Sequence, residues 1–285
     1  MKKRTKVLFP TDFTQPAASA FKYTLLLCHA LDADLEVMHV TFPQSEPLDI
    51  PVMAAQATQQ KVDVARELMD TFVATGLKAV EDQLDHQIQI ETAIELGSPV
   101  RAIVRIAERD GADLIVMGTR GERTGLGRLL GSVAAGVVDK AHCTVIVVPE
   151  ETAFKEPGNV AFATDITDAD PFVIWKLTQL LSPFKVIIHC VHFNMTGDMS
   201  DDFEKMEQMK SFFENRTPAV QLKFYHLPGK KLEIDINQFV EDYHMDMLVM
   251  VRPHRGMLEN LFHQSQVKRM AVSSNVPLLV QREER

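Results

Sequence analysis

Cysteine is scarce in this chain. Its 285 residues contain three cysteines, Cys28, Cys143 and Cys190, which lie far apart and show no paired spacing. This usage excludes a disulfide framework and a cysteine-rich zinc motif, and it is typical of a reducing compartment. The apolar stretch after the basic start Met1–Thr5 ends at Pro10, and no small-residue cleavage site follows. We therefore expect a cytoplasmic protein.

Long apolar runs and an excess of positive charge are also absent. No run approaches the roughly 18 residues that a membrane-spanning helix needs, so we expect no membrane partner. The formal net charge is −9, which disfavours a nucleic-acid partner because nucleic acid is itself a polyanion. With 46% apolar and 24% charged residues, the composition is that of a globular protein, and the length predicts two domains.

An internal repeat is the main feature that is present. Four segments of the first half are echoed in the same order in the second half: Pro10–Thr14 by Ala163–Thr167, His39–Phe42 by Cys190–Phe193, Asp113–Met117 by Asp246–Met250, and Thr144–Val147 by Pro277–Val280. The offset falls from 153 residues at the first echo (10 to 163) to 133 at the last (144 to 277). The repeat predicts two copies, residues 1–150 and 151–285, joined near 150–158.

Strand-length apolar runs alternate with helical patterns in the first copy. The expected strands are residues 6–10, 35–42, 88–96, 114–117 and 145–148. Helical periodicity covers residues 18–28 and a long segment from 53 to 84, and Ser98 with Pro99 marks a third helix start. Alternating strands and helices predict a doubly wound α/β domain with a parallel sheet and helices on both faces. The second copy repeats this plan.

A glycine-rich loop follows the fourth expected strand. It runs from Gly118 to Ser132 and leads into a helix, so backbone N–H groups and the positive end of the helix dipole can receive a phosphate. Arg120, Arg123 and Arg128 add positive charge. The loop is no Walker motif, which needs a lysine before the serine, and no dinucleotide fingerprint, which follows the first strand.

These residues resemble the universal stress protein family. The nucleotide-binding members carry Gly, two residues, Gly, nine residues, then Gly-Ser, and Gly118, Gly121, Gly131 and Ser132 have that spacing. The resemblance implies a strand order of 3-2-1-4-5 in each copy. It also implies that the first copy binds ATP, with ADP or AMP as alternatives and Mg²⁺ as a candidate companion. The implied site residues are Pro10, Thr11, Asp12, Val40, Met117, Gly118, Arg120, Gly121, Gly131, Ser132 and Val133.

Within this implied site, Asp12 and Val40 face the adenine, Met117 and Gly118 lie near the ribose, and the later residues hold the phosphates. Asp12 has an alternative role as a cap of the first helix, and both roles can coexist. Since no catalytic triad, carboxylate pair or metal cluster converges on the loop, we expect a regulatory or stress-response protein without catalytic residues.

The second copy departs from the pattern where phosphates would lie. The three matching glycine positions hold Val251, His254 and Gln264, whereas Ser265 survives and Asp165 and Val191 are taken to match Asp12 and Val40. We expect this copy to bind ATP weakly or not at all. The resemblance implies that the copies pair within the chain as a pseudo-dimer, with a homodimer and an unidentified protein partner as further expectations.

Three alternatives stay open. The same fold could hydrolyse ATP slowly, phosphorylate itself or transfer an adenylyl group, with Arg120 or Arg128 stabilising charge. Nucleotide could instead expose residues 53–84 to a protein partner. A metal site of His189 and His192 is disfavoured, because residues three apart on a strand point to opposite faces, and Cys143 is interpreted as a packing residue.

Overall fold

The structure of the chain is a computed structural model. It describes residues 4–42, 51–119, 130–150, 152–195, 197, 200–214, 220–252 and 260–283. The chain divides into a first unit, Met1–Phe154, and a second unit, Lys155–Arg285. Among the described helices, none has the combination of length and hydropathy that crossing a bilayer requires.

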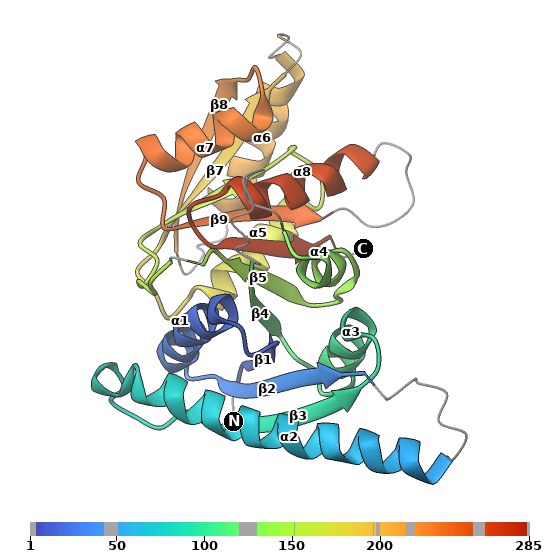
Figure 1. The fold of residues 1–285 in the computed structure, drawn as a ribbon. Coiled ribbons are helices and arrows are strands. Elements are labelled where there is room, and N and C mark those ends of the chain that lie inside the picture. The colour runs from blue at the N-terminus through green and yellow to red at the C-terminus, as the bar shows by residue number, and fades with distance from the viewer. Residues whose placement is uncertain are drawn as a thin grey trace. The chain divides into compact units, whose positions relative to one another are not determined.

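The first unit is a parallel sheet with helices on both faces (Figure 1). Its elements are β1 (Lys6–Thr11), α1 (Gln15–Leu31), β2 (Asp34–Thr41), α2 (Pro51–Lys78), η1 (Glu81–Gln83), β3 (Ile90–Leu96), α3 (Pro99–Arg109), β4 (Leu114–Gly118), α4 (Ser132–Lys140) and β5 (Thr144–Val148). The strand order is β3-β2-β1-β4-β5 and every neighbouring pair is parallel. Helix α1 contacts α2, and α3 contacts α4. The predicted fold and strand order are confirmed for this unit.

Helix α1 shows how local sequence limits an element. Pro16 lies in its first turn, where a missing N–H removes no helical hydrogen bond. Asp32 ends the helix in the left-handed region (φ 48°), and its N–H bonds to carbonyls of the last turn. The buried positions between them face the sheet: Ala17, Ala20, Phe21, Tyr23, Thr24, Leu25, Leu27 and Cys28. The apolar period of the sequence therefore marks the buried side.

Helix α2 is shorter than its sequence pattern predicts. The pattern extends over 53–84, but the helix ends at Lys78 and a separate short 3-10 turn follows. At Val80 the backbone leaves helical geometry (φ −126°, ψ 6°), and the Val80 side chain is 3% exposed. The helix thus breaks where the Val80 side chain is buried. Such burial depends on tertiary packing, which the helical period of the sequence does not show.

Aromatic side chains fill the layer between α1, α2 and the sheet of the first unit. The rings of Phe9 and Phe21 lie 5.2 Å apart between centroids, and those of Phe21 and Phe72 lie 4.9 Å apart. Gly76 allows this packing, because a Cβ there would stand 2.4 Å from the Phe21 ring. The close approach of α2 to α1 closes one face of the core.

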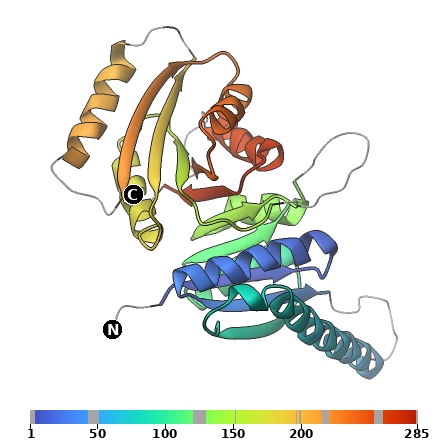
Figure 2. The same cartoon turned by 90° about the vertical axis from the view of Figure 1, so that its left-hand side faces the viewer.

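The second unit repeats the same topology (Figure 2). Its elements are β6 (Asn159–Ala163), α5 (Asp170–Leu180), β7 (Ile187–Asn194), α6 (Ser200–Glu214), β8 (Gln221–Pro228), α7 (Leu232–Asp242), β9 (Met247–Arg252), α8 (Asn260–Ser273) and β10 (Leu278–Arg282). The strand order is β8-β7-β6-β9-β10, again all parallel. Read in chain order within the unit, this is the predicted 3-2-1-4-5 arrangement.

Strand registers relate the two units residue by residue and correct one predicted match. The register pairs between first and second strands are Pro10–Met38 in the first unit and Ala163–Val191 in the second. Val191 therefore corresponds to Met38, and Phe193 corresponds to Val40, so the predicted match of Val191 to Val40 was wrong. The sequence comparison slipped by two residues, which in a strand preserves the face of every side chain and so leaves the apolar pattern unchanged.

The turn after the first strand is the same in both units. Phe13 has φ 63° and Ile166 has φ 56°, a conformation that is uncommon for residues other than glycine. In each case the strand-end threonine accepts the N–H of that residue through its hydroxyl, at 3.0 Å for Thr11 and 2.7 Å for Thr164. The two units therefore share this unusual backbone conformation as well as their strand order. The turn belongs to the common fold of both units.

Candidate functional site

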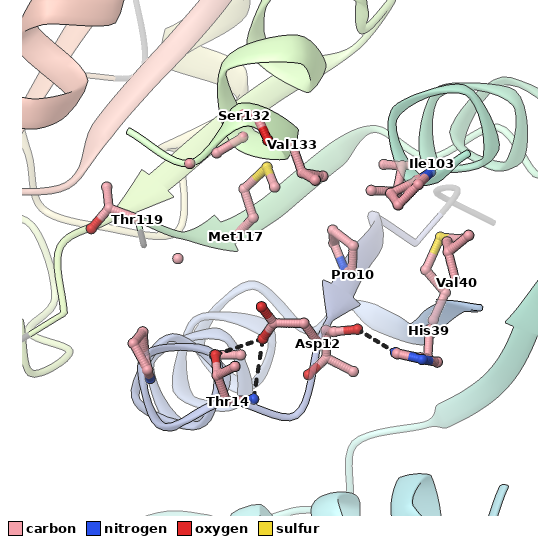
Figure 3. A pocket seen from close by; sticks show the side chains of 18 residues that line it. Pro10, Asp12, Thr14, His39, Val40, Ile103, Met117, Thr119, Ser132 and Val133 are labelled. Carbon is pink, nitrogen blue, oxygen red and sulfur yellow. Dashed lines mark hydrogen bonds between the residues drawn. The ribbon is translucent and has the colours of Figure 1, made fainter. Parts of the chain in front are cut away.

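A cavity of about 220 Å³ opens at the carboxyl ends of β1, β2 and β4 in the first unit (Figure 3). It is lined by Pro10, Thr11, Asp12, Thr14, Pro16, Ala17, Met38, His39, Val40, Pro99, Ile103, Met117, Gly118, Thr119, Gly131, Ser132, Val133 and Ala134. β1 pairs with β2 on one side and with β4 on the other. The order in which successive strands join the sheet therefore reverses at β1. Ligands of open α/β sheets bind at such switch points.

Asp12 organises the start of α1 at the floor of the cavity. Its Oδ1 accepts the backbone N–H of Thr14 at 3.1 Å and the Thr14 hydroxyl at 2.6 Å (Figure 3). Thr14 occupies the N-cap position but makes no capping bond with its own side chain. Asp12 therefore does stabilise the helix start, as the alternative interpretation expected. Asp12 also lines the cavity, so its bonds to Thr14 leave it at the wall of the site.

His39 lines the cavity beside Val40 and was missed by the sequence analysis. Its Nδ1 donates to the Thr11 carbonyl oxygen at 2.8 Å, and its ring stacks on Phe13 with 4.4 Å between centroids. The hydrogen bond, drawn in Figure 3, and the stacking contact together fix the ring at the end of β2. The sequence did hold a clue to His39, because it directly precedes the predicted site residue Val40. At the end of a strand, two consecutive residues can both border a pocket.

The first turn of α4 supplies hydrogen-bond donors to the opposite wall. Gly131 is the N-cap residue and has no side-chain capping bond, while its carbonyl accepts the N–H of Ala135 at 2.9 Å. The N–H groups of Ser132, Val133 and Ala134 precede the first intrahelical bond and lie on residues that line the cavity. Together with the helix dipole they favour an anion there.

Gly118 is required by packing as well as by access to the cavity. A Cβ at this position would stand 3.2 Å from the Pro16 carbonyl oxygen and 3.3 Å from the Ala20 Cβ. The end of β4 can therefore lie close to the first turn of α1 only without a side chain. The second unit has Val251 at this position, one residue before the end of β9.

Nine of the eleven predicted site residues line this one cavity. They are Pro10, Thr11, Asp12, Val40, Met117, Gly118, Gly131, Ser132 and Val133. Arg120 and Gly121 lie outside the described residues, as do Arg123 and Arg128. Ile103 and Pro99 of α3 were not predicted, because nothing in the local sequence indicates that α3 borders the ends of β2 and β4.

The second unit has an acidic side chain in the corresponding region. Counted from Thr11 and Thr164, Asp170 takes the place of Ala17, and it is 2% exposed. Its Oδ2 accepts the Thr164 hydroxyl and, at 2.7 Å, the Thr167 N–H. Burial raises the pKa of Asp170, although these hydrogen bonds oppose the rise. The position that borders the cavity of the first unit thus carries a buried carboxyl group in the second.

The histidines of β7 are separated as the sequence analysis expected. His189 bonds to Asn159 and to Tyr225, each at 3.1 Å, and burial lowers its pKa. His192 points elsewhere, towards Asp202 and His226. No local sequence pattern joins those three residues, because they come from three different elements.

Comparison with known proteins places these observations in a family. Residues 3–149 match the model of the universal stress protein family. A universal stress protein of Methanocaldococcus jannaschii is 34% identical over 145 residues, which are 50% of this chain and 81% of that protein. Another from the same organism is 26% identical over 156 residues, or 52% of this chain and 96% of that protein.

A solved structure matches over both units. The crystal structure of a universal stress protein from Archaeoglobus fulgidus superposes with a TM-score of 0.73 and 19% identity, covering 98% of each chain. At this identity the likeness concerns the fold alone. The family itself rests on the match of residues 3–149, which span the first unit from β1 to β5. The chain belongs to the universal stress protein family.

Proposed function

We propose that the first unit binds ATP, or a related adenine nucleotide, and that binding without rapid turnover is its regulatory function. The phosphates lie against the first turn of α4, at Gly131, Ser132 and Val133. The base lies towards Asp12 and Val40, and the ribose lies near Met117 and Gly118. Mg²⁺ accompanies the phosphates, since it binds proteins mainly through carboxylates and bound phosphate groups.

One observation carries this proposal: the first turn of α4, whose N-cap Gly131 has no side chain to cap it, and Asp12 border the same cavity. A nucleotide is anionic at its phosphates and carries hydrogen-bond donors on its base and ribose. The cavity presents amide donors on one wall and a carboxylate acceptor on another. Pro10, Met117 and Ile103 add apolar surface between them. This polarity matches a nucleotide from end to end.

Isothermal titration with MgATP tests the site. We expect about one nucleotide per chain, and we expect the double variant Gly131→Val with Ser132→Ala to lose detectable binding, because the side chain blocks the amides and the hydroxyl donor is gone. Ser265→Ala is the matched control, since the internal sequence repeat aligns Ser265 with Ser132. ADP and AMP titrations rank the ligands. Unaltered binding in the double variant would remove the site assignment.

A phosphate-release assay distinguishes binding from hydrolysis. Among the described lining residues, the Asp12 Oδ1 already accepts two hydrogen bonds and the His39 Nδ1 is bonded to Thr11. These contacts leave the Asp12 Oδ2 and the His39 Nε2 as acceptors, but in the proposed complex both residues lie at the base and ribose end of the site, away from the phosphates, so we expect no turnover above that of the double variant Gly131→Val with Ser132→Ala. Release of phosphate that depends on Gly131 and Ser132 would instead favour the ATPase alternative.

A further inference from the structure

A cluster of three side chains lies at the ends of the second and third strands of the second unit. His192 on β7 and His226 on β8 are register partners, so their side chains leave the sheet on the same face. Asp202 comes from the first turn of α6. The His192 Nε2 lies 3.1 Å from the Asp202 Oδ2, and the His226 Nε2 lies 3.7 Å from the same oxygen.

The protonation of His192 follows from its other contact. Its Nδ1 faces the carbonyl oxygen of Thr164 at 2.8 Å, and a carbonyl oxygen only accepts, so Nδ1 carries the proton. The Nε2 of a neutral His192 then directs a lone pair at the Asp202 carboxylate. Two acceptors at this distance require a positive charge between them, either a second proton on the ring or a metal ion.

His226 favours the metal ion over the proton. Among the described residues its buried Nε2 has no hydrogen-bond partner, and 3.7 Å from the carboxylate is too long for a hydrogen bond. A proton on His192 leaves this nitrogen unsatisfied, whereas one ion bound by all three groups satisfies it. A buried polar atom without a partner is costly, so a ligand that satisfies it stabilises the unit.

The carboxylate of the cluster is held in place from outside. The Asn194 side-chain amide donates to the Asp202 Oδ2, and the Asn194 Oδ1 accepts the N–H of Gly197 at 2.6 Å. The side chains of His192, Asp202 and His226 are 11%, 23% and 9% exposed. Metal sites in proteins share this organisation, in which outer hydrogen bonds orient the histidine and carboxylate ligands.

The distances and ligand types select the class of metal. In a tetrahedral site with bonds of about 2.1 Å, neighbouring ligand atoms stand about 3.4 Å apart. The two measured separations bracket this value, and the ligand atoms of all three residues lie within 4.8 Å of one another. Two imidazoles and one carboxylate suit Zn²⁺ and similar transition metals, whereas Mg²⁺ and Ca²⁺ prefer oxygen ligands.

The first unit provides a contrast. His39 corresponds to His192 and makes the same bond to a strand-end threonine, but its register partner on β3 is Ile94 in place of a histidine. A second group of His29, Asp85 and His86 has its carboxylate 87% exposed and bonded to the adjacent His86. That group lacks the burial of the cluster in the second unit.

We propose that the second unit binds one divalent transition-metal ion of the Zn²⁺ class through His192, Asp202 and His226. The ion ties the first turn of α6 to β7 and β8, and three protein ligands leave a fourth position for water. This site is independent of the nucleotide site and does not rest on the proposed function.

Zinc titration of the full chain tests the site after removal of metals with EDTA. We expect one Zn²⁺ per chain by isothermal titration and no uptake of Mg²⁺ at the same site. His226→Gln and Asp202→Asn are each expected to weaken Zn²⁺ binding by at least about tenfold. His142→Gln is the control, since His142 is an exposed histidine of the first unit, and it should leave affinity unchanged.

Two further measurements keep the test decisive. Trp175 is the only tryptophan and lies on α5 of the second unit, so its fluorescence in EDTA shows whether each variant is folded. Zinc-edge X-ray absorption of the wild type should show two imidazole ligands. Absence of Zn²⁺ uptake by the folded wild type, as an imidazolium–carboxylate pair without metal predicts, overturns the proposal. So does equal affinity in all the variants.

Discussion

At the scale of single residues, the two units differ in what they place against the end of the first strand. Ala17 borders the cavity of the first unit, and the buried Asp170 takes its place in the second. A carboxylate there opposes a triphosphate, because like charges at close range repel strongly where water is partly excluded. This one difference supports the proposal that the nucleotide binds in the first unit.

Exchanging this residue tests that reasoning. Ala17→Asp should weaken ATP binding by at least about tenfold, because it adds a negative charge to the wall of the cavity. Ala17→Asn has nearly the same shape without the charge and should weaken binding much less. Isothermal titration of the two variants, with circular dichroism to confirm folding, measures the difference. Equal losses in both would show that size, and not charge, matters at this position.

At the scale of elements, an aspartate before the fourth strand ties that strand to the first in both units. Asp113 accepts the N–H of Lys6 at 3.0 Å, and Asp246 accepts the N–H groups of Gly158 and Asn159 at 2.8 and 2.9 Å. The contact recurs at the first residue of two echoed segments, Asp113–Met117 and Asp246–Met250. In each unit this hydrogen bond joins the start of the first strand to the start of the fourth. The opposite ends of these two strands form the switch point.

The second of these contacts makes a pH-dependent contribution to stability. Partial burial opposes ionisation of Asp246, but hydrogen bonds from Lys155 and from the amides of Asn159 and Gly158 outweigh it, so its pKa is lowered. A carboxyl group whose pKa is lower in the folded state stabilises the fold above its unfolded pKa. That contribution disappears as the pH falls through the folded value.

We therefore expect Asp246→Asn to lower the free energy of unfolding of the second unit by about 1 kcal/mol at pH 7. The difference from the wild type should shrink below about pH 4, where the wild-type carboxylate also becomes protonated. Urea unfolding followed by Trp175 fluorescence at both pH values measures it. Asp242→Asn, at an exposed position of α7, is the control. A difference that does not depend on pH would contradict the charge argument.

At the scale of the whole molecule, one fold is used twice with different chemistry at the same end of the sheet. The first unit presents a cavity with amide donors, and the second presents a histidine and carboxylate cluster at its second and third strands. The proposals for the two units are separable, since the nucleotide variants should leave Zn²⁺ binding intact and the metal variants should leave ATP binding intact.

The sequence by itself determined the two copies, the fold class and half of the cavity residues. Apolar period and strand–helix alternation are local properties, and the glycine spacing fixes a loop and the helix start that follows it. Together with the family resemblance that the glycine spacing carries, these signals predicted nine residues, from Pro10 to Val133, that the structure brings to one cavity. The two-residue slip at Val191 shows their limit, because alternation does not fix register.

The tertiary structure alone decided which distant side chains meet. His39, Ile103 and Asp170 border or fill the switch-point region through the packing of separate elements. His192, Asp202 and His226 converge because β7 and β8 pair in register and α6 returns over their ends. Such contacts depend on how elements pack in three dimensions, and no local pattern in the sequence records that packing.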